Sequence, residues 1–308
     1  MKAIICTKYG PPEVLEFREI PKPVPKIDEV LIKVHATTVH IGDTRIRRFN
    51  IPGNFLIKVM AKLFLGWRGP RKNILGMELS GVIEDIGSDV SKFKIGDAVF
   101  ASMNLNFGAY VEYKCLKETD LIALKPNNTS FGEAAALPNG NFTSLCIIKQ
   151  ANIQSGQKVL IYGASGSIGT AAIQFAKNLG TEVTAVCSTT NVDLVRSLGA
   201  DHVIDYTKQD FTESGENYDV VFDAVDKYPR DKAKKAGNIY LNVDTNSNKC
   251  KMTQTVLVEL KNIVEEGKLK IVVDREYRFE EIIEAHRYVD LGHKKGNVVV
   301  NVYNNQEK

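Results

Sequence analysis

The residues with the clearest chemical potential form a glycine-rich stretch, G-A-S-G-S-I-G, at Gly163–Gly169. It follows an apolar run that is typical of a buried strand and precedes a segment with helical periodicity. Glycines there let the backbone leave the strand sharply and approach a diphosphate closely, while helix N-terminal amides face its charge. A plain turn between a strand and a helix is the alternative. The predicted dinucleotide contacts of this loop are Gly163, Ser165, Gly166, Ser167, Ile168 and Gly169.

The end of the next apolar strand, Glu182–Cys187, should select the dinucleotide. NAD sites commonly place an acid at this point to bind the ribose hydroxyls. Here Ser188, Thr189 and Asn191 follow the strand, and no carboxylate occurs before Asp193. Hydroxyl and amide groups can bind a 2′-phosphate, and no acid repels it. The strand end therefore predicts NADPH, with NADH as the alternative, and these three polar residues as cofactor contacts.

Three segments of the chain, each with its own sequence pattern, are predicted to form the elements that position these residues. Residues 1–125 contain short β-like runs separated by proline and glycine turns, which indicates a β-rich domain. Residues 126–272 alternate strands with helices, which predicts a parallel, doubly wound sheet. From residue 273 the chain returns to mixed character, with an amphipathic helix over Phe279–Leu291 and a final strand at Val298–Val300. The predicted fold class is α/β.

Composition narrows the function classes. The chain has 308 residues, 44% hydrophobic and 25% charged, with a formal net charge of +3 and no basic block, so a nucleic-acid partner is disfavoured. Met1–Cys6 is predicted to be a first strand rather than a signal peptide. The five cysteines are scattered and form no C-x-x-C pair. We therefore expect reduced thiols, no structural zinc site and a cytoplasmic location.

The most apolar segment, Phe55–Leu65, is too short to span a bilayer. It carries Lys58 and Lys62 four residues apart, on one helical face. A short surface helix packed on its own domain is predicted, and a helix that contacts a membrane is the alternative.

Several linked motifs resemble those of one enzyme family. They are the opening M-K-A-I-I-C-T-K-Y-G-P-P-E-V-L, the stretch Gly76–Phe100, A-A-A-L-P at Ala134–Pro138, the glycine loop, S-L-G-A-D-H-V-I-D-Y at Ser197–Tyr206 and K-K-G-N-V-V-V at Lys294–Val300. Over almost its full length the chain resembles the medium-chain dehydrogenase/reductase superfamily, in its zinc-free quinone oxidoreductase-like branch. The resemblance implies a GroES-like domain at 1–125, joined by 273–308, and a Rossmann domain at 126–272, with the cofactor in the cleft between them.

The resemblance also bears on metal chemistry. The positions that match the catalytic zinc ligands of zinc-dependent members are His40, Met77 and Asn139. Only the imidazole is a good zinc ligand, since a thioether and an amide are poor ones. No zinc is therefore expected.

Further site residues are implied by the resemblance alone. His40 would lie beside the nicotinamide, where it could bind a carbonyl oxygen or donate a proton, or simply line the pocket. Asp43 would orient a partner, and Thr143 would lie near the nicotinamide and diphosphate. Additional cofactor contacts would be Tyr206, Val225 and Asn297.

These features predict a zinc-independent, NADPH-dependent homodimeric oxidoreductase that reduces a small hydrophobic carbonyl compound or quinone. Compared with its relatives, the chain looks shorter between Asp226 and Thr253, where they place sheet and dimer-forming material. A dinucleotide-binding protein with a structural or regulatory role and little turnover is therefore an alternative. A zinc-dependent alcohol dehydrogenase is a third hypothesis. No membrane span is expected.

Overall fold

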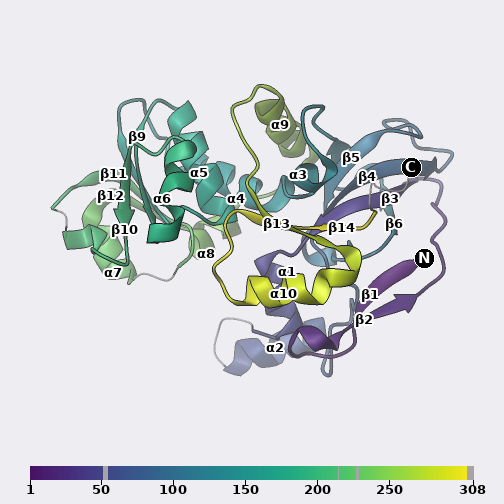
Figure 1. The fold of residues 1–308 in the computed structure, drawn as a ribbon. Helices are drawn as coiled ribbons and strands as arrows, with labels where there is room; N and C mark the ends of the chain where they lie inside the picture. Colours follow the sequence, from purple (N-terminus) through teal and green to yellow (C-terminus); the bar gives the residue numbers. More distant parts are fainter. Residues whose placement is uncertain (51–54, 214, 227–228, 304–308) are drawn as a thin grey trace. The chain divides into compact units, whose positions relative to one another are not determined.

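The chain folds into two compact units in a computed structural model that describes residues 1–50, 55–213, 215–226 and 229–303 (Figure 1). Unit 1 comprises Met1–Asn139 and Val273–Lys308, and unit 2 comprises Gly140–Val272. The segment from 126 to 139 thus belongs to unit 1. Among the described residues, no helix is long and apolar enough to cross a membrane.

Unit 1 is rich in β-structure. Its described strands are β1 (Lys2–Cys6), β2 (Leu15–Glu19), β3 (Glu29–Thr38), β4 (Glu78–Ile86), β5 (Ala98–Ser102), β6 (Tyr113–Lys117), β7 (Ile122–Leu124), β13 (Val273–Arg278) and β14 (Asn297–Asn301). Seven of them form one sheet in the order β13-β14-β3-β4-β5-β7, with β6 also paired to β3. Of these described pairs, only β13 and β14 are parallel neighbours. β1 and β2 form a separate antiparallel pair.

The helices of unit 1 accompany this sheet. They are α1 (Ile41–Arg47), α2 (Phe55–Leu65), α3 (Phe131–Ala135) and α10 (Ile282–Asp290), with 3₁₀ turns η1 (Pro12–Val14), η2 (Asn104–Asn106) and η7 (Phe279–Glu281). The fully buried Arg47 ties α1 to α10, because its guanidinium bonds His286 Nδ1, the carbonyl of Gly10 and the carboxylate of Asp290. These contacts connect the first helix to the C-terminal segment.

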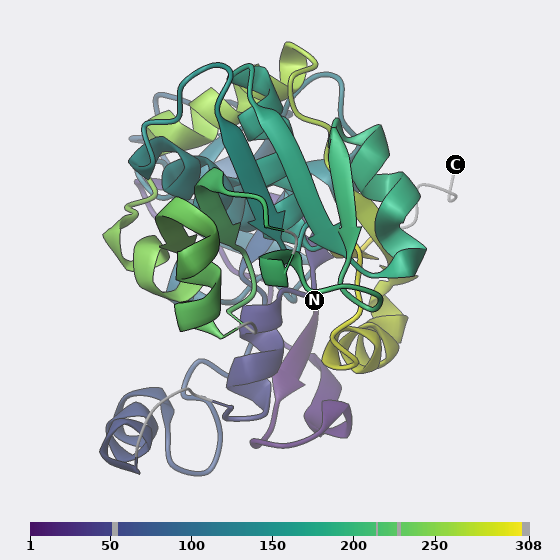
Figure 2. The ribbon, with the colours of Figure 1, turned by 90° about the vertical axis from the view of Figure 1, so that its left-hand side faces the viewer.

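Unit 2 is a five-stranded, fully parallel sheet with the order β10-β9-β8-β11-β12. The teal and green strands run side by side in Figure 2. These strands are β8 (Lys158–Tyr162), β9 (Glu182–Cys187), β10 (His202–Asp205), β11 (Tyr218–Asp223) and β12 (Gly237–Asn242). The central strands β8 and β11 are continuous apolar runs with buried side chains, as strands covered on both faces require. The predicted α/β class is confirmed.

Helices and 3₁₀ turns connect the strands of unit 2. They are α4 (Pro138–Gln150, which begins in unit 1), α5 (Ser167–Asn178), η3 (Thr189–Asn191), α6 (Val192–Ser197), η4 (Phe211–Glu213), α7 (Arg230–Ala233), η5 (Lys234–Ala236), α8 (Val243–Asn246), η6 (Ser247–Lys249) and α9 (Gln254–Glu265). After β12 the described chain adds no strand to this sheet, so β12 is an edge strand.

The helix predicted over Phe55–Leu65 is present as α2, and it contacts its own domain through Leu65, which packs against a core of unit 1. None of its residues is buried. Large apolar side chains, among them Phe55 and Phe64, point into solvent, while Lys62 lies over the rings of Phe49 and Trp67. The apolar face is therefore turned outward.

The prediction that all cysteines are reduced thiols is also wrong. Cys146 on α4 and Cys250 before α9 form a disulfide across 104 residues of sequence. The side-chain amide of Gln150 donates to both sulfur atoms. The spacing of cysteines along the sequence cannot reveal such a pair, because only the folding of unit 2 brings Cys146 close to Cys250.

Candidate functional site

The glycine loop lies between β8 and α5, as predicted. Gly163 adopts φ +74°, a left-handed conformation that leaves the strand sharply. A Cβ at Gly169 would lie 2.3 Å from the carbonyl oxygen of Gly163, so only glycine allows α5 to approach the strand this closely. Two of the three glycines are thus required by the backbone itself.

Gly166 differs from Gly163 and Gly169, because it has room for a side chain and its backbone does not require a glycine. Its backbone is extended, with φ −79° and ψ 174°, and a methyl group added at its Cα would find the oxygen of Gly163 as its nearest neighbour, at 3.7 Å. Gly166 is the N-cap of α5, and this glycine has no side chain with which to cap the helix. The first-turn amides and the positive end of the helix dipole lie at this end of α5. The geometry fits an incoming diphosphate.

Polar side chains at the end of β9 meet the same loop. Asn191 donates from Nδ2 to the hydroxyls of Ser165 (3.0 Å) and Ser188 (3.1 Å). Its Oδ1 is buried and has no hydrogen-bond partner in the described part of the chain. This acceptor is free to receive a hydrogen bond from a ligand hydroxyl or a water molecule. The predicted residues Ser165, Ser188 and Asn191 are therefore neighbours.

The sequence prediction missed one acid in this region. Asp205, the last residue of β10, accepts hydrogen bonds from the hydroxyls of Thr189 (2.5 Å) and Thr207 (2.7 Å). These bonds lower the pKa of Asp205 to about 2. A carboxylate thus lies beside the predicted cofactor residue Thr189. The signal was available, because parallel strands end at one edge of a sheet and Asp205 ends the strand next to β9.

Val225 is held in a turn at the carboxyl end of β11, and its side chain contacts the glycine loop. A Cβ on Gly163 would lie 2.6 Å from Val225 Cγ1, so the two residues already touch. The carboxylate of Asp223 accepts the backbone N–H groups of Val225 (3.1 Å) and Asp226 (2.8 Å). The other predicted contact here, Tyr206, is half exposed after β10, with its ring 6.4 Å from that of Tyr162.

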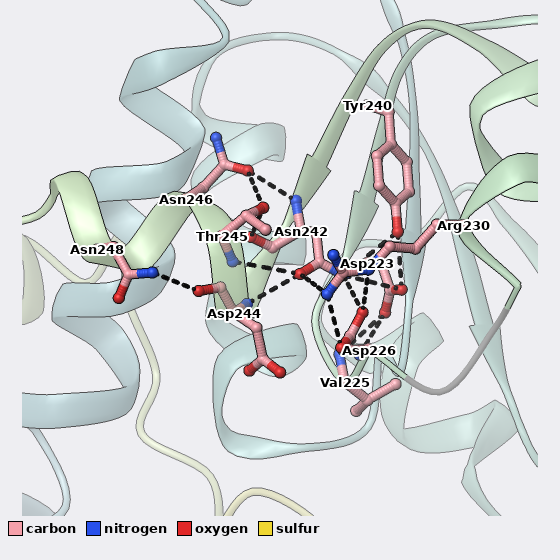
Figure 3. Close-up of polar contacts among 10 residues, drawn as sticks. All are labelled: Asp223, Val225, Asp226, Arg230, Tyr240, Asn242, Asp244, Thr245, Asn246 and Asn248. Atoms are coloured by element: carbon pink, nitrogen blue, oxygen red, sulfur yellow. Dashed lines mark hydrogen bonds and ion pairs between the residues drawn. The ribbon is translucent and has the colours of Figure 1, made fainter. Parts of the chain in front are cut away.

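A polar network fixes this turn (Figure 3). Asn242 at the end of β12 donates to the carboxylates of Asp223 (3.3 Å) and Asp226 (2.7 Å). Tyr240 donates its hydroxyl to Asp223, and Arg230 forms an ion pair with Asp226. The sequence prediction did not include these positioning residues, because Tyr240 and Asn242 on β12 and Arg230 on α7 meet the end of β11 only in the folded unit.

Thr143 lies on α4, half-buried. One turn earlier on the same helix, Gly140 packs against Ser167 at the start of α5, where its Cβ would be 3.1 Å from that of Ser167. Residues three apart share a helix face. Thr143 is therefore on the side of α4 that faces the glycine loop.

In unit 1, His40 and Asp43 form a capping box at the start of α1. His40 Nδ1 accepts from the N–H of Gly42 (3.0 Å), while Asp43 accepts from the N–H groups of His40 (3.0 Å) and Gly76 (2.9 Å). Burial, reinforced by the positive charges of Lys294 and Arg45, lowers the pKa of His40 to about 3. The ring is therefore neutral at physiological pH, and its proton is on Nε2, which is a donor.

A buried carboxyl group lies close by. Glu78 accepts from the hydroxyl of Thr38 (2.5 Å) and from the N–H of Asn139 (3.0 Å). Burial raises the pKa of Glu78 to about 7 and lowers that of Lys294 to about 8, while each group's charge favours the charged form of the other. Burial likewise raises the pKa of Asp43 to about 7. This part of unit 1 therefore holds several groups that titrate near neutrality.

The three positions that match zinc ligands do lie together. Met77 Sδ and His40 Nδ1 flank Gly42, and Asn139 Nδ2 donates to the carbonyl of Met77 (3.4 Å). The amide oxygen of Asn139 accepts from Ser102 (2.7 Å). One imidazole, one thioether and one engaged amide do not fit catalytic zinc. Within the described residues, no three His, Cys, Asp or Glu side chains form a metal-binding group.

The last predicted contact, Asn297, is the first residue of β14 in unit 1. It is buried and lies opposite Val273 of β13. Its place is thus in the sheet of unit 1, whereas the glycine loop belongs to unit 2.

A glycine loop that joins a buried parallel strand to the open N-terminus of a helix defines unit 2 as a Rossmann-type dinucleotide-binding domain. Comparison with family models agrees. The model described as "Alcohol dehydrogenase GroES-like domain" matches residues 26–158, and two models described as "Zinc-binding dehydrogenase" match residues 167–236 and 228–300.

Individual relatives cover nearly the whole chain. The chain is 32% identical to 2-methylene-furan-3-one reductase of Solanum lycopersicum, over 97% of this chain and 79% of the relative. It is 33% identical to the chloroplastic NADPH-dependent alkenal/one oxidoreductase of Arabidopsis thaliana, with the same coverage. Among solved structures, the quinone oxidoreductase from Coxiella burnetii matches with a TM-score of 0.81 and 29% identity, over 98% of this chain and 99% of that one. The chain belongs to the medium-chain dehydrogenase/reductase superfamily, in its quinone oxidoreductase-like branch.

Proposed function

We propose that this protein is a zinc-independent, NADPH-dependent oxidoreductase that transfers hydride to a quinone or to the β-carbon of an α,β-unsaturated carbonyl compound. The observation that carries the proposal is the open cradle at Gly166, at the head of helix α5. Relatives named as an NADPH-dependent alkenal/one oxidoreductase and as quinone oxidoreductases support the choice of cofactor and acceptor.

The nicotinamide, when bound, supplies the hydride, and the chain supplies binding and orientation. The amides of Ser167 and Ile168 at the head of α5 bind the diphosphate, and Gly166 leaves the room for it. Ser188, Thr189 and Asn191 are proposed to bind the adenosine ribose and its 2′-phosphate, although the carboxylate of Asp205 beside Thr189 opposes the phosphate charge. Tyr206, Val225 and Asn297 remain proposed contacts.

The catalytic roles follow from protonation. A neutral His40 with its proton on Nε2 donates a hydrogen bond to the carbonyl oxygen of the acceptor, where negative charge develops during hydride transfer. The N–H of Gly42 keeps the imidazole in this orientation, because it donates to Nδ1, and Asp43 holds the backbone of His40 by accepting its N–H. Thr143 is proposed to contact the nicotinamide end of the cofactor.

The decisive experiment uses Gly166→Ala. The Cβ of this variant meets only an ordinary contact at 3.7 Å, so the protein should fold normally, yet the methyl group occupies the cradle. The dissociation constant for NADPH, measured by fluorescence titration, should rise about tenfold or more, and NADH should bind more weakly than NADPH to the parent. Gly169→Ala is the contrast, because its Cβ collides with backbone at 2.3 Å and should lower the melting temperature. Unchanged NADPH affinity in Gly166→Ala would refute the diphosphate site.

Turnover is tested separately. Purified protein should oxidise NADPH in the presence of a quinone or an enone from a small panel. Tight binding without turnover on any acceptor would support instead the dinucleotide-binding protein with a structural or regulatory role. Stoichiometric zinc in the purified protein, with activity lost to a chelator, would overturn the zinc-independent mechanism.

Assembly and location are further proposals. We expect a homodimer, which light scattering on the same preparations will test, and β12 is the edge strand of unit 2 that a partner subunit could cover. The cytoplasmic location stays a prediction, and several relatives are named as chloroplastic or mitochondrial proteins.

A further inference from the structure

Helix α2 presents a continuous apolar surface to solvent. Within and just after this helix, large side chains that are about half to four-fifths exposed follow one another, namely Leu56, Ile57, Met60, Leu63, Phe64 and Trp67. Phe55 at the start of the helix is 82% exposed. Single exposed apolar residues are ordinary, but a contiguous cluster of this size marks an interaction surface.

The orientation of α2 makes this exposure specific. At 100° per residue, Leu56, Met60 and Phe64 fall on one side of the helix, and Lys58 and Lys62 fall on the other. Lys62 is turned toward the rings of Phe49 and Trp67, and Leu65 packs against a core of unit 1. α2 lies at the periphery of unit 1 in both views (Figures 1 and 2). The helix is therefore anchored through its less apolar side.

The charge around this surface is of one sign. From Thr44 to Met77 the sequence contains eight Lys and Arg residues and no Asp or Glu. Lys58, Arg68 and Arg71 are exposed, and among the described residues none of them forms an ion pair with an acid. The apolar face is thus flanked by uncompensated positive charge.

We propose that the apolar face of α2 binds the surface of a lipid bilayer that contains anionic lipids. Aliphatic and aromatic side chains on a convex helix can enter the headgroup–acyl boundary, while the flanking cations bind anionic headgroups. Trp67 has the amphipathic character that favours this boundary. The binding is peripheral, and it does not depend on the proposed redox chemistry.

Charge argues against a second copy of the chain as the occupant. A twofold-symmetric interface places the same patch on both subunits, so it would gather two copies each of Lys58, Arg68 and Arg71 and no acid from the segment Thr44–Met77. Like charges brought together at an interface are unfavourable. An anionic bilayer instead neutralises all of them at once.

The test is co-sedimentation of the full-length protein with phosphatidylcholine vesicles, with and without phosphatidylglycerol. The parent should bind the anionic vesicles, and added salt should weaken the binding. Met60→Ser with Phe64→Ser should reduce the partition coefficient about tenfold or more, and Lys58→Glu with Arg68→Glu should abolish the preference for anionic vesicles. The matched control is Ile95→Ser with Lys94→Glu, an exposed apolar–basic pair elsewhere in unit 1, and it should bind like the parent.

Several results would overturn the proposal. The first is a parent protein that does not bind anionic vesicles, and the second is a control variant that loses binding equally. A third is an oligomer that dissociates in the Met60→Ser, Phe64→Ser variant without vesicles, which would make α2 an interface between copies. A fourth is a raised KM of that variant for a water-soluble quinone without vesicles, which would assign the face to substrate binding.

Discussion

The disulfide between Cys146 and Cys250 makes a quantitative prediction about unit 2. It closes a loop of about a hundred residues that contains all five strands of the parallel sheet. For such a loop the chain-entropy model gives about 4.7 kcal/mol of stabilisation, and typical measured values are about 2–4 kcal/mol. Replacing both cysteines by serine should therefore destabilise unit 2 by about 3 kcal/mol. For a unit of this size that corresponds to a fall in melting temperature of roughly 10 °C.

Differential scanning calorimetry, without reductant, measures this effect. The parent should lose the same increment of stability when a reductant is added, whereas the Cys146→Ser, Cys250→Ser variant should not respond. Cys115→Ser, which removes a half-buried free thiol from unit 1, is the control and should leave the unit 2 transition unchanged. Peptide mapping without reduction should recover the two cysteines as one linked species. A double variant that melts within about 2 °C of the parent, with both thiols free in the parent, would refute the reasoning.

Three further predictions concern the two units separately. Asn242→Ala removes the donor that holds Asp223 and Asp226, so the turn at Val225 should loosen against the glycine loop and the dissociation constant for NADPH should rise about tenfold, measured by fluorescence titration. Burial raises the pKa of Glu78 to about 7, so between pH 4.5 and 7 its carboxyl group is protonated in the native state and ionised in the unfolded state. The free energy of unfolding should therefore fall as pH rises from about 4.5 to about 7. Glu78→Gln should flatten this pH dependence, measured in melting curves across pH. Arg47→Leu leaves the carbonyl of Gly10 without its buried donor and leaves Asp290 with only the partly exposed Arg48 as a partner, so it should cost about 3 kcal/mol in denaturant unfolding. The exposed Arg45→Leu should change stability by less than about 0.5 kcal/mol.

The glycine loop could be predicted from the sequence because the residues that form it are consecutive in the chain. A buried strand, a left-handed glycine and a helix start occupy consecutive positions, and the structure has them at β8, Gly163 and α5. The mismatch at the zinc positions was equally readable, since it depends only on which residue types stand at matched motif positions. The poor donor set of His40, Met77 and Asn139 follows directly from those identities.

The neighbours of the predicted cofactor contacts could be predicted from the sequence only in part. Asp205 lies sixteen residues from Thr189 in sequence, and the two become neighbours because β9 and β10 pair in register. Likewise, Asn242 meets Asp223 only because β11 and β12 pair. Such contacts depend on strand pairing, which a pattern of side-chain types along one chain does not specify.

The sequence by itself determined the fold class, the place of the glycine loop between a strand and a helix, and the poor donor set at the matched zinc positions, because short-range backbone and side-chain chemistry governs each of them. Only the tertiary structure revealed the disulfide between Cys146 and Cys250 and the outward face of α2. A disulfide requires two distant segments to be brought within bonding distance. The exposed side of an amphipathic helix depends on what packs beneath it, and the chain places Lys62 rather than Phe64 against its own surface.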